Sequence, residues 1–101
     1  MMQIIQSETF NKWATGLRDL QARALVASRL LRLSQGMAND IAALGDSLFE
    51  LRLHAGPGYR IYFIREGATV VVLLSGGTKG SQARDILKAK HLAHQWRHHH
   101  D

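Results

Sequence analysis

The chain has 101 residues, of which 46% are hydrophobic, and its 13 lysines and arginines outnumber 8 aspartates and glutamates to give a formal charge of +5. This length fits one domain, expected over residues 1–101, and the hydrophobic fraction excludes a disordered chain. The absence of cysteine excludes disulfides and thiolate metal sites. No apolar run approaches the roughly 20 residues of a membrane span. We therefore expect a cytoplasmic protein whose charge favours a polyanionic partner.

The first third of the sequence reads as a strand followed by two helices. Residues 2–6 predict a short strand, after which apolar residues recur at helical spacing: Phe10, Trp13, Ala14 and Leu17. Ser7 or Thr9 can cap this helix, and Asp19 can cap a second helix that Gly36 ends. The buried stripe of the second helix is expected to comprise Val26, Ala27, Leu30 and Leu31. The two helices should form a hairpin that covers a sheet.

The remaining two thirds alternate with a period of two before a final helix begins. Residues 37–46 are expected to form a connection, residues 49–54 and 59–64 two strands around a Gly-Pro-Gly turn, and residues 69–74 a buried strand. Residues 76–80 read as a flexible glycine loop. Ser81 should cap a last helix that runs to about Arg97 with five residues facing inward: Ile86, Ala89, Leu92, Ala93 and Trp96. The order β-α-α-β-β-β-α predicts an α+β two-layer domain with a mainly antiparallel sheet and the helical hairpin on one face.

Strand alternation gathers polar and basic side chains on the sheet face opposite the helical hairpin. The expected members are Glu50, Arg52, His54, Arg60 and Tyr62. Lys79 should approach from the glycine loop. We expect this face to be open and to suit a phosphodiester, because arginine binds phosphate oxygens and lysine stabilises developing negative charge. The competing interpretation is an ordinary solvated face with a half-exposed tyrosine and a loop lysine.

The same face contains groups that can transfer protons or contact bases. Histidine, lysine or tyrosine can shuttle protons, and Tyr62 can stack on an unpaired base. An attack by the 2′-hydroxyl of RNA would need neither metal nor other cofactor. His54 on this face is expected to bind RNA, and Arg84 and Lys88 on the last helix either bind RNA or form a solvated surface. The histidines at 91, 94 and 98–100 have helical spacing, but we expect the terminal run to be a solvated end rather than a metal site.

Three segments together resemble the RelE/ParE toxin superfamily, especially its HigB-like "addiction module killer" branch, which has phage-encoded relatives. They are Leu48-Phe49-Glu50-Leu51-Arg52, Gly56-Pro57-Gly58-Tyr59-Arg60-Ile61-Tyr62-Phe63 and Leu73-Leu74-Ser75-Gly76-Gly77-Thr78-Lys79-Gly80-Ser81-Gln82, followed by Asp85-Ile86 and Ala89-Lys90. The resemblance covers nearly the whole chain. It implies a microbial RNase fold whose RNA-cleaving members act in the ribosomal A site.

The resemblance also implies which residues act. The family's basic positions match Arg52, Arg60 and Lys79. RelE-type enzymes often carry a tyrosine early in the final segment, where this sequence has residues 83–86, Ala-Arg-Asp-Ile. Tyr62 or Tyr59 would have to replace it, or the reaction proceeds without a tyrosine.

The resulting hypothesis is the toxin of a type II toxin–antitoxin system that cleaves mRNA on the ribosome. Its expected partners are a cognate helix-turn-helix antitoxin, the ribosome and mRNA, with operator DNA contacted only through the antitoxin and no membrane. Two alternatives remain open, because a shared fold does not settle activity. One is a ParE-like poison of DNA gyrase, and the other is a non-catalytic corepressor that acts with its antitoxin.

Overall fold

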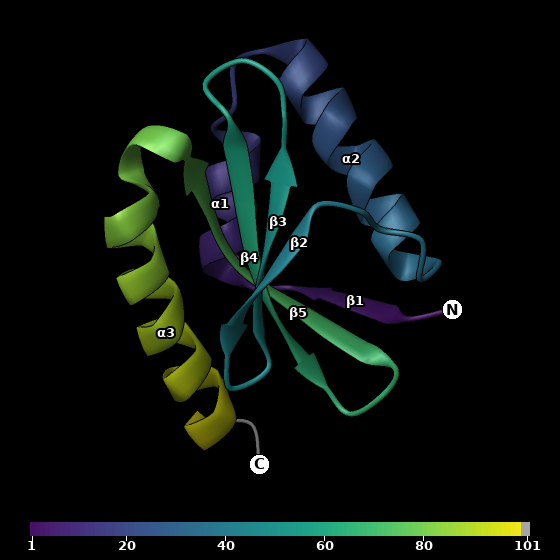
Figure 1. Cartoon of the computed structure of the whole chain (residues 1–101), viewed down its shortest axis with the longest axis vertical. Helices are drawn as coiled ribbons and strands as arrows, with labels where there is room; N and C mark the ends of the chain where they lie inside the picture. Colours follow the sequence, from purple (N-terminus) through teal and green to yellow (C-terminus); the bar gives the residue numbers. More distant parts are fainter. Residues whose placement is uncertain (100–101) are drawn as a thin grey trace.

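The computed structural model describes residues 1–99, which form eight helices and strands and one short 3-10 turn (Figure 1). In chain order these are β1 (Gln3–Gln6), α1 (Glu8–Thr15), α2 (Leu20–Ser34), β2 (Ile41–Gly45), β3 (Leu48–Leu53), β4 (Tyr59–Glu66), β5 (Val70–Thr78), η1 (Lys79–Ser81) and α3 (Gln82–His99). Among these residues, no helix is long and apolar enough to cross a membrane. The last histidine of the terminal run, His100, lies outside the described residues.

The five strands form one sheet in the order β1-β5-β4-β3-β2. Only β1 pairs with its neighbour in parallel, and the other three pairings are antiparallel. The predicted α+β class and the mainly antiparallel sheet are therefore confirmed. The prediction of a plain connection over residues 37–46 was wrong, because Ile41–Gly45 pairs with β3 as an edge strand. Asp46 and Ser47 follow it with positive φ and turn the chain directly into β3.

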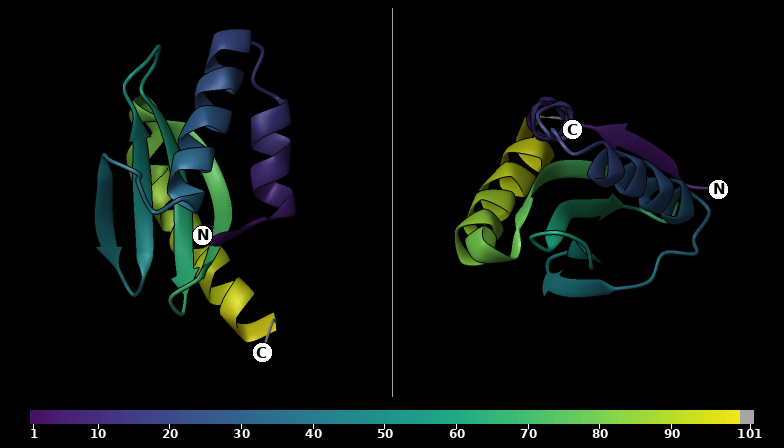
Figure 2. Two further views of the ribbon diagram at one scale, coloured as in Figure 1. Left: turned by 90° about the vertical axis from the view of Figure 1, so that its right-hand side faces the viewer. Right: turned by 90° about the horizontal axis from the view of Figure 1, so that it is seen from above.

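The helical hairpin of α1 and α2 packs on one face of the sheet, as predicted. Ser7 and Asp19 cap the two helices, each accepting a backbone N–H with its side-chain oxygen. The core on this side centres on Phe10, Val26 and Leu33 with inward residues of β3, β4 and β5. In the left view of Figure 2, α2 lies in front of the sheet and α3 behind it.

The predicted buried stripe of α2 was partly wrong. Ala22, Val26 and Leu33 are buried, whereas Ala27 is exposed and Leu31 is 57% exposed. The helix is therefore turned so that the stripe containing Ala22 and Val26 contacts the sheet. Because α2 is apolar over more than half its circumference, spacing alone did not choose between the two stripes.

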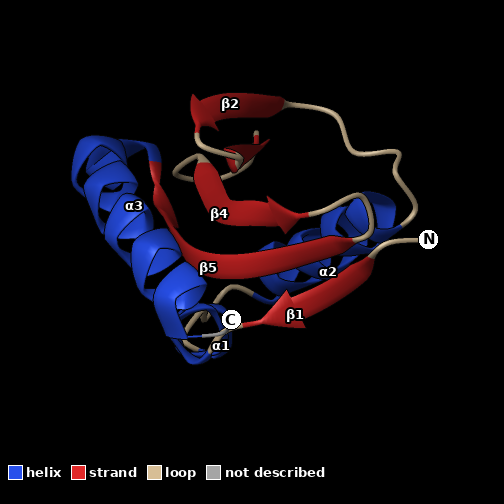
Figure 3. Ribbon diagram, turned by 90° about the horizontal axis from the view of Figure 1, so that it is seen from below, coloured by secondary structure: helices blue, strands red, loops and turns tan. Residues whose placement is uncertain are grey.

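The opposite face of the sheet is covered by α3, so the expectation of an open face there was wrong. Ala89 and Ala93 are buried against residues of β3, β4 and β5. Ile86, Leu92 and Trp96 pack around them, which confirms the inward side predicted for this helix. The view in Figure 3 shows α3 running across the end of the curved sheet beside β5. The helix continues to His99 rather than ending at about Arg97.

The glycine doublet at 76–77 belongs to β5 and is not part of a flexible loop. A Cβ on Gly76 would lie 2.2 Å from Cδ2 of Trp13, and a Cβ on Gly77 would lie 1.9 Å from Oδ2 of Asp85. The two residues are therefore glycines because α1 approaches one face of the strand and α3 the other. This close packing fixes the start of α3 over the end of β5.

Candidate functional site: two arginines around a buried glutamate

Two rows of paired residues place the polar cluster on the face covered by α3. Glu50 of β3 pairs with Tyr62 of β4, which pairs with Ser75 of β5. In the next row, Arg52 is opposite Arg60. Directly paired residues on neighbouring strands point to the same face, so the structure brings together four of the predicted residues: Glu50, Arg52, Arg60 and Tyr62.

Glu50 is the centre of this cluster, a role that the sequence analysis missed. Its side chain is completely buried, and its Oε1 lies 2.7 Å from Nε of Arg52 and 3.5 Å from Nη1 of Arg60. The side-chain amide of Gln82, the first residue of α3, donates to Oε1 at 3.2 Å and to Oε2 at 3.0 Å. One carboxylate therefore links both arginines to the first turn of α3.

Glu50 is ionised at neutral pH. Burial alone would raise its pKa, but hydrogen bonds from Arg52 and Gln82 and the charge of Arg60 together lower the pKa below its usual value of 4.5. A buried carboxylate needs such partners, because an isolated buried charge is strongly unfavourable. The cluster of Glu50, Arg52 and Arg60 thus has one negative and two positive charges.

Arg60 lies on the predicted face but not in the open position that we expected. Only 8% of the residue is exposed, because the start of α3 covers this end of the sheet. Its Nε and Nη1 are buried without a hydrogen-bond partner among residues 1–99, although Nη1 keeps the ion pair with Glu50. Arg52 is more accessible, with 44% of its side chain exposed.

Tyr62 is fully buried, so the expectation of an exposed tyrosine that stacks on a base was wrong. Its hydroxyl lies near the carboxylate of Glu50 but makes no hydrogen bond of good geometry among the described residues. Burial raises the pKa of Tyr62 above its usual value of 10.0, and the negative charges of Glu50 and Asp85 raise it further. The phenol therefore stays protonated at physiological pH and does not serve as a base in this position.

Lys79 and His54 have different positions relative to the arginines. The backbone N–H of Lys79 donates to the carbonyl of Gly58 at 2.8 Å, which places this exposed lysine beside the turn between β3 and β4, close to the start of β4. His54 Nε2 lies 3.5 Å from the carboxylate of Asp40, which also pairs with Arg29 of α2. His54 is therefore engaged away from Glu50.

The two basic residues predicted on the last helix, Arg84 and Lys88, are exposed in the first half of α3. Between them, Asp85 is 9% exposed and accepts a short hydrogen bond from the hydroxyl of Ser81. This carboxylate packs against Gly77. The four-residue spacing of Ser81 and Asp85 was the sequence feature that could have predicted this contact, since residues four apart along a helix lie on one face.

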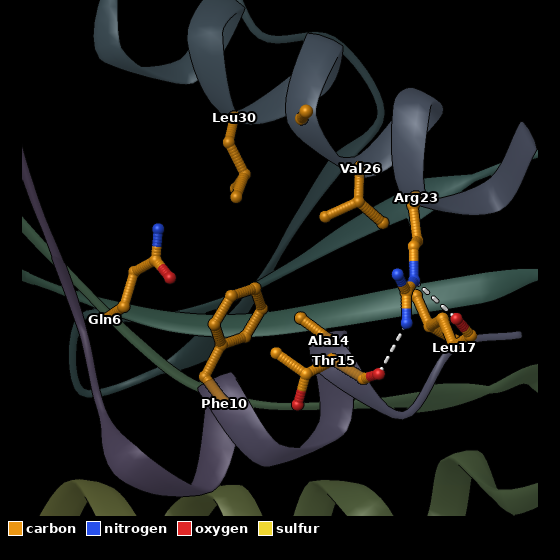
Figure 4. A pocket seen from close by; sticks show the side chains of 9 residues that line it. Gln6, Phe10, Ala14, Thr15, Leu17, Arg23, Val26 and Leu30 are labelled. Atoms are coloured by element: carbon orange, nitrogen blue, oxygen red, sulfur yellow. Dashed lines mark hydrogen bonds between the residues drawn. The ribbon is translucent and has the colours of Figure 1, made fainter. Parts of the chain in front are cut away.

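A hollow between the two helices of the hairpin lies apart from the arginine pair. It has a volume of about 290 Å³ and lies between α1 and α2, where Phe10 and Ala14 point toward Val26 and Leu30 (Figure 4). Arg23 closes its end by donating to the carbonyls of Thr15 and Leu17 at 2.7 and 2.6 Å. Within residues 1–99, no three histidine or acidic side chains gather in a way that would hold a metal ion.

Comparison with solved structures defines the class of fold. The structure is similar to that of the Escherichia coli toxin RelE in its free state, solved as a mutant with two arginines changed to alanine. The TM-score is 0.69, and the match covers 87% of this chain and 92% of that one at 15% identity. At this identity the similarity establishes a RelE-like fold.

Comparison of sequences gives the family. The chain is 40% identical over 94 residues to an uncharacterized protein of Haemophilus influenzae, covering 93% of this chain and 95% of that protein. The chain therefore belongs to the same family as this Haemophilus protein. No protein-family model matches the sequence.

Proposed function

We propose that this protein is the toxin of a type II toxin–antitoxin pair and that it cleaves mRNA on the ribosome. The observation that carries the proposal is the arginine pair on β3 and β4, held by a buried carboxylate at one end of a RelE-like sheet. Lys79 lies beside the turn at the same end. Two neighbouring arginines and a lysine at the same end of the sheet suit a phosphodiester and its charged transition state.

In the proposed reaction, the 2′-hydroxyl oxygen of one nucleotide attacks the adjacent phosphorus. The new bond closes a 2′,3′-cyclic phosphate, and the bond from phosphorus to the 5′ oxygen breaks to leave a 5′-hydroxyl. Arg52 and the accessible edge of Arg60 stabilise the negative charge on the phosphate oxygens. Lys79 donates a proton to the leaving oxygen, and the proton of the attacking hydroxyl passes to solvent. Tyr62 contributes as packing beneath the site.

The proposal includes an antitoxin that binds and neutralises the protein. The chain carries a formal charge of +5, so an antitoxin with an acidic segment would be attracted to it. We propose a helix-turn-helix protein from the neighbouring gene, with operator DNA contacted only through that protein. Arg84 and Lys88, exposed beside the start of α3, are proposed to contact RNA phosphates.

The test uses purified ribosomes programmed with a defined mRNA and the variants Arg52→Ala and Lys79→Ala. Lys79 is exposed, so Lys79→Ala should leave the fold intact. Arg52→Ala removes one partner of the buried Glu50, so its cleavage rate is normalised to the folded fraction measured by circular dichroism. Each change should slow cleavage by about 10²-fold or more, since each removes one stabilising charge. Arg32→Ala, an exposed residue of α2, is the matched control and should cleave at the wild-type rate. Full activity in a folded Arg52→Ala, Lys79→Ala double variant would exclude this site.

A further inference from the structure

We infer that Glu50 is a positioning residue that holds the guanidinium groups of Arg52 and Arg60 in register for a phosphate. This inference rests on the proposed function and adds a residue to it. Glu50 is completely buried and does not touch a substrate on the surface. It acts through the arginines, to which it is joined by contacts of 2.7 and 3.5 Å.

The need for a positioning group follows from the pairing of the strands. Arg52 and Arg60 are direct cross-strand partners, and like charges in that arrangement repel each other. The carboxylate of Glu50, two residues before Arg52 on β3, neutralises one of the two charges. Without it, the more accessible Arg52 would turn toward solvent, and the two guanidinium groups would no longer present a fixed spacing.

The contacts also leave the arginines able to bind a ligand. Nε of Arg52 is occupied by Glu50, but 44% of this side chain remains exposed and can meet a phosphate. Nε and Nη1 of Arg60 are buried beside the carboxylate, so a phosphate can reach only the small exposed part of Arg60, which Glu50 holds in place by charge. Gln82 holds the carboxylate from the other side with two hydrogen bonds, so the first turn of α3 determines where Glu50 lies.

The experiment compares Glu50→Gln with Glu66→Gln, which makes the same change of charge at the far end of β4, where Glu66 faces Arg97. RNA binding and single-turnover cleavage on programmed ribosomes are measured at saturating protein, with rates normalised to the folded fraction. Glu50→Gln should bind RNA at least as tightly as Glu66→Gln, because it frees Arg52. Its saturated cleavage rate should fall by about a hundredfold, as for a reacting group displaced by about 1 Å.

A purely structural role for Glu50 would give a different result. The folded fraction would fall, but the normalised saturated rate would equal that of Glu66→Gln, and this outcome would overturn the inference. If Glu50→Gln does not fold, Gln82→Ala replaces it, since it removes two hydrogen bonds to Glu50 and keeps the charge. It should lower the same rate without weakening RNA binding, and an unchanged rate would again count against Glu50.

A second readout separates this inference from the proposed function. The Nε–H proton of Arg52 should give a resolved NMR signal in slow exchange with water, because it is hydrogen bonded to Glu50. That signal should disappear or move in Glu50→Gln and remain in Glu66→Gln. A wild-type protein that cleaves no RNA would refute the proposed function alone. An Arg52 signal that is the same in all three proteins would refute the positioning role alone.

Discussion

The close contact between Gly76 and Trp13 gives a sharp test of the packing. In Gly76→Ala, the added methyl group would lie 2.2, 2.3 and 2.5 Å from three ring atoms of Trp13. Ordinary carbon contacts need about 3.5 Å, so the ring or the strand must move by roughly 1 Å. Trp13 has little room, since its ring packs against Phe10 at 5.8 Å and Tyr59 at 6.3 Å between centroids.

Overpacking of this kind typically costs about 1–3 kcal/mol. For a domain of this size, each kcal/mol lowers Tm by about 4–8 °C. Urea and thermal unfolding of Gly76→Ala should show this loss, with a change in tryptophan fluorescence. Gly80→Ala is the control, because the nearest atom to its added methyl group is Thr78 Oγ1 at 3.8 Å. Equal stability of the two variants would refute the account of the glycine doublet.

Five further predictions concern stability. Tyr62→Phe should change the free energy of unfolding at pH 7 by less than about 1 kcal/mol, because the hydroxyl makes no hydrogen bond of good geometry among the described residues. Because the pKa of Tyr62 is raised in the folded state, the contribution of its protonated phenol to stability is complete below pH 10.0 and decreases above it. Above pH 10.0, the free energy of unfolding measured in urea should therefore fall more steeply in the wild type than in Tyr62→Phe. The lowered pKa of Glu50 has the opposite effect, because its contribution to stability is present above pH 4.5 and is lost as the pH falls through the folded-state pKa. In acid, the stability of Glu50→Gln should therefore depend less on pH than that of the wild type. An equal pH dependence in the two proteins would contradict the ion pairs. Arg23→Lys should cost roughly 1 kcal/mol in urea unfolding, since lysine lacks the fork that donates to Thr15 and Leu17, while Arg32→Lys should cost nothing measurable. Arg60→Ala should lower stability by about 1–3 kcal/mol, because it removes a buried side chain and one charge beside Glu50 while Arg52 and Gln82 still hold the carboxylate. A Tm equal to that of the wild type would contradict this contact.

Local patterns predicted most of the secondary structure. The spacing of Phe10, Trp13 and Ala14 and the cap at Ser7 agree on the first helix, whereas Leu17, expected in the same stripe, lies beyond the end of α1 and still packs on the core. The edge strand β2 was missed because Ile41–Gly45 is short and half exposed, and its identity as a strand depends on pairing with β3. Pairing partners far along the chain leave no local pattern.

The site was predicted in part for a related reason. Alternation in β3 and β4 correctly put Glu50 and Arg52 on one face with Arg60 and Tyr62. The apolar side of α3 was also correct, but its pattern does not say which face of the sheet it covers. The prediction therefore treated the cations as an exposed group and placed Glu50 among them without its central role, which follows from its burial. The sequence feature that could have predicted this role is a glutamate two residues before an arginine on a strand, because the two side chains then lie on the same face.

The glycine doublet shows the same limit. Gly76 and Gly77 were taken as a flexible loop because paired glycines are typical of turns. Their actual reason is the approach of Trp13 from one side and Asp85 from the other. A glycine chosen for close contact and one chosen for freedom of φ look alike until the neighbouring elements are placed.

The most direct test of the proposed function is to induce the protein in cells without its antitoxin and map the 5′ ends of all mRNAs within minutes. The account predicts new ends inside translated reading frames, an early stop in protein synthesis, and loss of both effects in the Arg52→Ala, Lys79→Ala double variant. Intact mRNAs accompanied by DNA breaks and an SOS response would contradict it and indicate a poison of DNA gyrase.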